Sequence, residues 1–267
     1  FASPCRGQGD GEPLFAYEGF DYPHRDWGTG SSNKPAGEGL MHLMAGSGWG
    51  SVWFESFDTS LYNGVAVYPA DAGSGADGRT SPLSYTDSND ASLLTVGGQA
   101  RTSFGNGSKS LRHLDMSRIP PSLLNADSRI GLDGTSIWVS FLAQSYDGAG
   151  DGRYAYVALG DSLRMGKVGD TTGNWGVADP GSSATEVGSI SSSEPVFLVA
   201  RVDFAAGDDL ATVWLNPSLQ TEPSAPDLAL TVDDFSFTYV TVEGRYSTDF
   251  DEIRLGTSYE AVTPATP

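Results

Sequence analysis

The segment Thr248-Asp249-Phe250-Asp251-Glu252-Ile253-Arg254-Leu255-Gly256-Thr257 decides the fold. Its second half alternates apolar and polar residues and offers Ile253 and Leu255 to a core, which is typical of a β-strand with one buried face. Its first half places Asp249, Asp251 and Glu252 at the entrance of the strand. The segment therefore predicts a strand that buries one face and carries an acidic cluster.

A matching segment lies near the other end of the chain, Phe15-Ala16-Tyr17-Glu18-Gly19-Phe20-Asp21-Tyr22. It is also rich in apolar and aromatic residues, and it also carries acids. A first and a last strand of this kind predict a β-sandwich in which the two terminal strands pair. Their acids would then lie close together and could surround a cation.

Composition limits the classes of partner. The chain has 267 residues, of which 39% are hydrophobic, and no apolar run reaches the ~18 residues of a membrane-spanning helix, so no membrane insertion is expected. The net charge of −19, from 34 acids and 15 bases, argues against nucleic acid, because phosphate binding needs a basic surface. The acids either keep the protein soluble or bind Ca²⁺ through several oxygens.

The chain reads as a polar N-terminal arm, residues 1–13, and one domain, residues 14–267. Strand-like runs separated by turn residues predict roughly ten to thirteen antiparallel strands. The runs are Leu14–Phe20, Gly50–Phe57, Leu93–Val96, Ala100–Phe104, Ser136–Gln144, Tyr154–Leu159, Asp161–Lys167, Trp175–Ala178, Val196–Phe204, Ala211–Leu215, Phe235–Val242 and Phe250–Gly256.

Three connections between the predicted strands have residues that predict their structure or role. Gly97-Gly98 lies between two of these runs and is typical of a hairpin turn. Met116–Asn125 contains two prolines that suit the start of one short helical turn. The loop 69–92 is rich in Asp, Ser and Gly, and its length in a compact domain indicates a functional loop.

Ordered blocks across most of the chain carry a family resemblance. They are Tyr17–Tyr22, Gly48–Gly50 with Trp53, Gly134–Phe141, Asn174–Gly176, Val202–Phe204, Val213–Pro217 and Phe250–Gly256. Together they resemble the concanavalin A-like, laminin-G-like jelly-roll domains of secreted bacterial proteins, including proteins with PEP-CTERM-type surface-sorting tails. The resemblance implies two curved antiparallel sheets packed face to face and an extracellular or cell-surface location. It implies no reaction, because fold alone does not fix function.

Enzymes that share this fold need residues that we do not find. Laminarinase-type hydrolases take their carboxyls from one strand with the spacing Glu-x-Asp-x-x-Glu, whereas Glu55 and Asp58 would point to opposite faces of a strand. Polysaccharide lyases need a Tyr/His pair, and His24, His42 and His113 lie far apart in the sequence. No serine elbow, phosphate-binding loop or dinucleotide fingerprint occurs. We therefore assign no catalytic residues.

A structural Ca²⁺ is the chemical hypothesis for the acids. Related carbohydrate-binding sandwiches pair an early Glu with a late Asp around an ion, and by resemblance Glu18 and Asp251 match these positions, with Asp21 and Asp249 in support. Neighbouring carboxylates repel and raise one another's pKa unless a cation lies between them. The alternative is a solvated acidic edge that discourages aggregation between sheets.

Aromatic residues in loop-like segments are the candidates for stacking on sugar rings. The alternative for each of them is packing in the core. The candidates are Trp27, Trp49, Tyr68, Tyr85 and Trp175.

We expect a non-catalytic extracellular module that binds polysaccharide at or near a bacterial cell surface. The alternative is a self-assembling subunit of an extracellular filament or surface layer, in which the arm 1–13 adds a strand to a neighbouring molecule. A polysaccharide-degrading enzyme is the third hypothesis. A sugar-binding surface with two or more accessible aromatic rings would favour the first.

Overall fold

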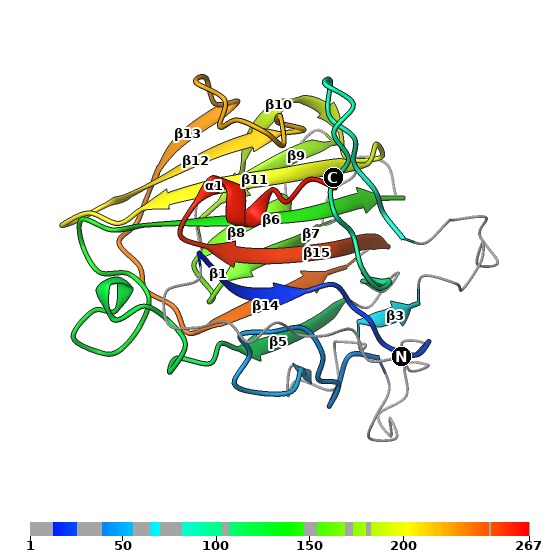
Figure 1. The fold of residues 1–267 in the computed structure, drawn as a ribbon, viewed down its shortest axis with the longest axis horizontal. Helices are drawn as coiled ribbons and strands as arrows, with labels where there is room; N and C mark the ends of the chain where they lie inside the picture. The colour runs from blue at the N-terminus through cyan, green and yellow to red at the C-terminus, as the bar shows by residue number, and fades with distance from the viewer. Residues whose placement is uncertain are drawn as a thin grey trace.

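The protein folds as a β-sandwich of two antiparallel sheets (Figure 1). The computed structural model describes residues 13–25, 39–55, 65–69, 82–102, 107–146, 154–168, 173–179, 183–245 and 247–266. In this part of the chain, strands alternate with short turns, and the helical elements are one 3₁₀ turn, Pro121–Leu123, and α1, Tyr259–Val262. The predicted all-β jelly-roll sandwich is therefore confirmed.

Both sheets bring together strands that are far apart in the sequence. The order of the first sheet is β13-β12-β11-β6-β15-β4-β3, with β1 beside β15. Its strands are β1 (Leu14–Glu18), β3 (Ala66–Tyr68), β4 (Gln99–Arg101), β6 (Ser136–Ser145), β11 (Val196–Asp203), β12 (Asp209–Leu215), β13 (Leu228–Val232) and β15 (Thr248–Gly256). The order of the second sheet is β10-β9-β8-β7-β14-β5-β2. Its strands are β2 (Phe54–Glu55), β5 (Ser108–His113), β7 (Ala155–Leu159), β8 (Leu163–Lys167), β9 (Asn174–Ala178), β10 (Thr185–Ser191) and β14 (Tyr239–Gly244).

The predicted pairing of the terminal strands is confirmed. β1 runs antiparallel to β15, with Tyr17 opposite Arg254 and Glu18 opposite Ile253, and Figure 1 shows the two strands side by side. The other edge of β15 pairs with β6, and its first half also pairs with β4. β15 therefore lies inside the first sheet, and Ile253 and Leu255 are fully buried in the core between the sheets.

The two faces of the first sheet are both covered. Side chains that alternate along β6 and β11 point inward to the main core, and the side chains between them point outward. The outward set is covered by residues from the segment 82–94, from residue 219 and from α1, which lies in front of β6 and β15 in Figure 1. This second apolar layer consists of Leu83, Leu93, Trp138, Leu142, Phe197, Val199, Trp214, Leu219, Tyr259 and Val262.

Some sequence-based expectations need correction. The hairpin at Gly97-Gly98 does not form, because the segment 93–96 lies over β15 instead of pairing with β4. There the Leu94 amide donates to the Pro264 carbonyl and the Val96 amide donates to the Glu252 carboxylate. Four strands, β3, β5, β10 and β13, were not expected. The predicted helical turn in Met116–Asn125 is present as the 3₁₀ turn. None of the described helices is long and apolar enough to cross a membrane.

Candidate functional site

The outer face of the second sheet presents polar and aromatic side chains. Val240 and Val242 of β14 point into the core, so Tyr239 and Glu243 point outward. The register places Glu243 between Lys109 of β5 and Tyr156 of β7. The residues Lys109, Tyr156, Asp161, Tyr239 and Glu243 are called the Lys109 face below.

Hydrogen bonds and ion pairs join Lys109 of β5, Tyr239 and Glu243 of β14 and Asp161 into one chain across the face. The Lys109 ammonium lies 3.2 Å from the Glu243 carboxylate and 3.4 Å from the carboxylate of Asp161, which is in the β7–β8 turn. The Tyr239 hydroxyl donates to Asp161 over 2.6 Å, and the Tyr154 hydroxyl donates to Glu243 over 3.4 Å. The Lys109 ammonium therefore lies beside two carboxylates, and each carboxylate accepts a hydrogen bond from a tyrosine hydroxyl.

Burial and neighbouring charges on the Lys109 face shift the pKa values of Lys109, Asp161 and Tyr239. Burial lowers the pKa of Lys109, but Glu243 and Asp161 outweigh burial, so the pKa lies above its usual value. The Tyr239 hydrogen bond, aided by Lys109, holds the pKa of Asp161 below its usual value despite burial. Burial and the Asp161 carboxylate raise the pKa of Tyr239 to about 12. At neutral pH, Tyr239 is thus a neutral hydrogen-bond donor, and Asp161 is an ionised acceptor.

Aromatic rings border the Lys109 face on the β5 side. His113 is exposed and packs edge-on against Tyr239, with 5.4 Å between the ring centroids. Phe54 of β2 is half-buried and packs edge-on against His113 at 6.3 Å. Tyr154 stacks on Tyr156 at 5.6 Å on the other side. The face thus combines the exposed His113 ring and the half-buried Tyr239 ring with charged hydrogen-bonding groups, a combination that suits sugar hydroxyls and ring faces, whereas the Tyr156 ring is buried.

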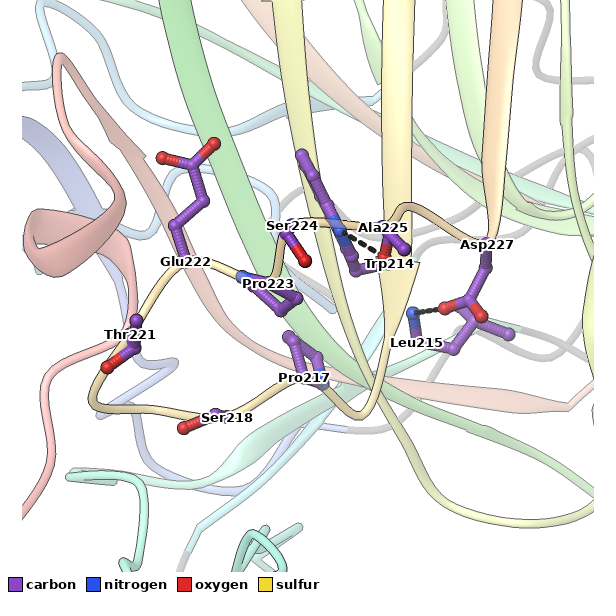
Figure 2. Close-up of a pocket in the computed structure, with 10 residues that line it drawn as sticks. All are labelled: Trp214, Leu215, Pro217, Ser218, Thr221, Glu222, Pro223, Ser224, Ala225 and Asp227. Carbon is purple, nitrogen blue, oxygen red and sulfur yellow. Dashed lines mark hydrogen bonds between the residues drawn. The ribbon is translucent and has the colours of Figure 1, made fainter.

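A pocket of about 600 Å³ beside the connection between β12 and β13 is a second candidate binding site (Figure 2). Its wall contains Trp214 and the prolines Pro217 and Pro223. The dashed lines in Figure 2 show that the Trp214 indole donates to the Ala225 carbonyl and that Asp227 accepts from the Leu215 amide.

These bonds hold the loop of the pocket in place. The Trp214 ring is only 5% exposed and stacks on Trp138, with 5.4 Å between the centroids. Glu222 is exposed and extends away from the loop in Figure 2. The pocket offers no accessible aromatic face, and the Lys109 face is therefore the stronger candidate.

Glu18, the first of the four acids predicted to bind calcium, lies in a buried ion pair. Arg112 of β5 points between the sheets and pairs with the Glu18 carboxylate, so the pair links β1 of one sheet to β5 of the other. The carboxylate also accepts from the Tyr22 hydroxyl at 2.8 Å, the Trp53 indole at 3.1 Å and the Phe20 amide at 2.9 Å. Its oxygens are thus already occupied by donors.

The other three acids do not join Glu18. Asp249 lies on the outer side of β15 and accepts from Arg101, Gln99 and Tyr146. Asp251 is buried in the same strand, and its Oδ2 atom has no hydrogen-bond partner. Asp21 is exposed. Among the described residues, no group of three or more His, Cys, Asp or Glu side chains is placed to hold a metal ion, so the expected coordination shell is not assembled there.

The five aromatic residues predicted to bind sugar do not share one surface. Trp175 is fully buried in the core between the sheets, so its assignment as a stacking platform is wrong. Tyr85 packs on Phe197 and donates to the Pro217 carbonyl in the cover of the first sheet. Trp49 donates to the Tyr17 carbonyl, and Tyr68 lies beneath the Arg101 guanidinium at 4.4 Å. Trp27 lies outside the described residues.

Two further predicted segments are covered only in part. Residues 70–81 of the loop 69–92 and residues 1–12 of the arm lie outside the described residues. The rest of the loop is structural, because both carboxylate oxygens of Asp87 accept backbone amides, Asn89 and Ala91 on one side and Leu219 on the other.

Comparison with known proteins gives a fold likeness and no family. No protein-family model matches the chain, and no curated protein matches it. Similar solved structures include Trypanosoma rangeli sialidase with the inhibitor DANA, at 12% identity and TM-score 0.38, over 72% of this chain and 33% of that chain. The botulinum neurotoxin serotype C1 binding domain is similar at 9% identity and TM-score 0.37, over 77% and 47% of the two chains.

The exoplasmic/lumenal domain of VIP36 in its Ca²⁺-bound form is similar at 8% identity and TM-score 0.34, over 74% of this chain and 93% of that chain. The chain spans about a third of the sialidase chain. At these TM-scores, the likenesses carry no argument about ligand or activity.

Proposed function

We propose that the protein is a non-catalytic glycan-binding β-sandwich that binds saccharides on the Lys109 face. The observation that carries the proposal is the hydrogen-bonded chain from Tyr239 through Asp161 and Lys109 to Glu243, bordered by the accessible His113 ring. A ligand hydroxyl can accept from Lys109 and donate to either carboxylate, while the rings pack against the sugar.

Binding is favoured over catalysis by the state of the same groups. A general base must be able to accept a proton at working pH, whereas Tyr239 keeps its proton because its pKa is about 12. Both carboxylates are engaged by Lys109, so neither is free to act as a nucleophile. An extracellular or cell-surface location belongs to this proposal, since such a module meets polysaccharide there.

Replacing Tyr239 with alanine is expected to weaken saccharide binding at least about tenfold, because it removes both the ring beside His113 and the donor to Asp161. Isothermal titration calorimetry of the intact chain against a panel of neutral and acidic oligosaccharides measures the effect. Thermal melting of the variant verifies that it is folded.

Glu222→Ala is the matched control, because Glu222 lines the pocket near Trp214 and is exposed. It is expected to leave binding unchanged. If Glu222→Ala abolishes binding and Tyr239→Ala does not, the binding site is the pocket and the Lys109 face is not. Release of reducing ends from a polysaccharide, lost on Glu243→Gln, would show an enzyme instead.

A further inference from the structure

We infer that the Lys109 face binds a saccharide with an isolated anionic group, a carboxylate or a sulfate, and that Arg164 of β8 receives this group. The inference rests on the proposed glycan-binding function and adds the chemical class of the ligand.

Arg164 is a cation without a partner on this face. Leu163 and Met165 point into the core, so Arg164 points outward, and it is half-buried. Its guanidinium lies over the Tyr156 ring, 5.2 Å from the centroid. None of the described residues forms a hydrogen bond or an ion pair with it. The five donors of this guanidinium therefore remain available to a ligand.

Among the described residues Arg164 has no carboxylate partner, which distinguishes it from the buried arginines of the chain. With 34 acids and 15 bases, acidic partners are plentiful. The buried arginines Arg101, Arg112 and Arg254 each pair with a carboxylate. Asp161 is near enough for Arg164 to affect its pKa, but its oxygens bond to Tyr239 and Lys109 instead. The Tyr156 ring keeps the guanidinium in place, which suits bidentate binding of a planar carboxylate.

The strand register places small residues on both sides of Arg164. Ala158 of β7 and Ala178 of β9 are its neighbours in the two adjacent strands. In the next row, Gly166 and Gly176 follow Tyr156. Ala158 and Ala178 are buried with Tyr156 in a small apolar cluster, whereas Arg164 is only half-buried, so its guanidinium is the accessible cation among them.

The ligand should carry few charges. The net charge of −19 and the carboxylates of Asp161, Glu186 and Glu243 around the face repel a dense polyanion. A largely neutral saccharide with one acidic group avoids most of this repulsion and still pairs with Arg164. The same chemistry occurs in a uronic acid and in a sulfated sugar.

The test compares matched ligand pairs by calorimetry. One pair is a xylo-oligosaccharide with a single glucuronic acid and the same oligosaccharide without it. The other is a galacto-oligosaccharide with a single sulfate and its desulfated form. We expect the intact protein to prefer an acidic member at least about tenfold, and we expect Arg164→Gln to abolish that preference while neutral binding changes less than about twofold. Arg164→Lys should retain part of the preference, because lysine keeps the positive charge but lacks the planar guanidinium that binds a carboxylate through two hydrogen bonds.

Arg201→Gln is the matched control. Arg201 also lies over an aromatic ring, Trp138 at 5.9 Å, but it belongs to the first sheet and pairs with Asp203. It should leave the preference unchanged. A preference in one ligand pair alone identifies the source as uronic acid or sulfate and supports the inference. Equal binding of acidic and neutral members, or equal loss of both in Arg164→Gln, overturns the inference and leaves the proposed function standing. If no saccharide binds, both the inference and the proposed function are wrong.

Discussion

Replacing Glu18 with alanine is expected to lower the free energy of unfolding by ~3–5 kcal/mol at neutral pH, because it leaves a buried arginine without its carboxylate. Glu18 and Arg112 are both buried between the sheets. The substitution also removes the acceptor of the Trp53 indole and of the Tyr22 hydroxyl. Urea denaturation followed by tryptophan fluorescence measures the loss.

Two variants show whether the loss comes from the unpaired charge. Glu222→Ala removes an exposed carboxylate and should change stability by less than about 0.5 kcal/mol. The double variant Glu18→Ala with Arg112→Met should lose less than the sum of the two single variants, because it removes both charges. A loss below about 1 kcal/mol for Glu18→Ala alone would contradict the role of the pair as the main polar link between the sheets.

Asp251→Asn is expected to raise the free energy of unfolding by ~1–3 kcal/mol at pH 7 to 8, because it removes a charge that the fold does not satisfy. The register of β15 against β6 shifts between Asp251 and Arg254, and Glu252 in this bulge has a left-handed backbone with φ of +56°. The Asp251 carboxylate accepts one bond, from the Glu252 amide, and its other oxygen is buried without a partner.

The pH dependence of stability distinguishes this explanation from simple repacking. Burial, and next the Glu252 carboxylate, raise the pKa of Asp251 well above its usual value. The folded state therefore holds this proton more tightly than the unfolded state. The stability due to Asp251 is fully present below the unfolded pKa and is lost as pH rises through the folded pKa. The gain from Asp251→Asn should thus grow as pH rises from 4 to 8, as melting temperatures across that range would show.

Asp249→Asn is the contrasting variant, since Asp249 lies two residues earlier on the same strand. Its carboxylate accepts from Arg101 at 2.8 Å, from Gln99 at 2.6 Å and from Tyr146 at 2.8 Å. Asparagine there should destabilise the fold, because the buried ion pair between Arg101 and Asp249 would be lost. If both variants shift stability in the same direction at pH 7, the difference in bonding between the two carboxylates does not determine their effect.

The terminal strands could be predicted from the sequence because their pattern is local. The apolar content of β1 and the alternation of apolar residues in the second half of β15 are local features, and they predict two strands with side chains in the core. The bulge at Glu252 did not disturb the prediction, because Ile253 and Leu255 still reach the core. The acids in these strands were visible, but Arg101 and Arg112, which pair with Asp249 and Glu18, could not be assigned to them because both arginines are distant in sequence.

The candidate site could not be predicted because no single segment contains it. Lys109, Tyr156 and Glu243 come from three strands and meet only through strand register. β5 itself gave no signal, since its inward residues include Ser110 and Arg112, and such a polar inner face does not alternate as a strand of a core should. A pairing of Lys109 with Glu243 could have been found only from the position of both strands in the sheet.

The place of the last strand has a consequence for how the chain reaches its native state. β15 is an interior member of its sheet and holds β1, β4 and β6 together, although β1 begins at residue 14 and β15 begins at residue 248. During synthesis, the edges of β1 and β4 that pair with β15 have no strand partner until residues 248–256 have left the ribosome. The unpaired edges of β1 and β4 must wait for a strand that begins at residue 248, and such non-local pairing is slow and prone to aggregation. The first sheet is therefore complete only after β15 has been synthesised, and a chain truncated before residue 248 would lack the strand that joins β1 and β4 to β6.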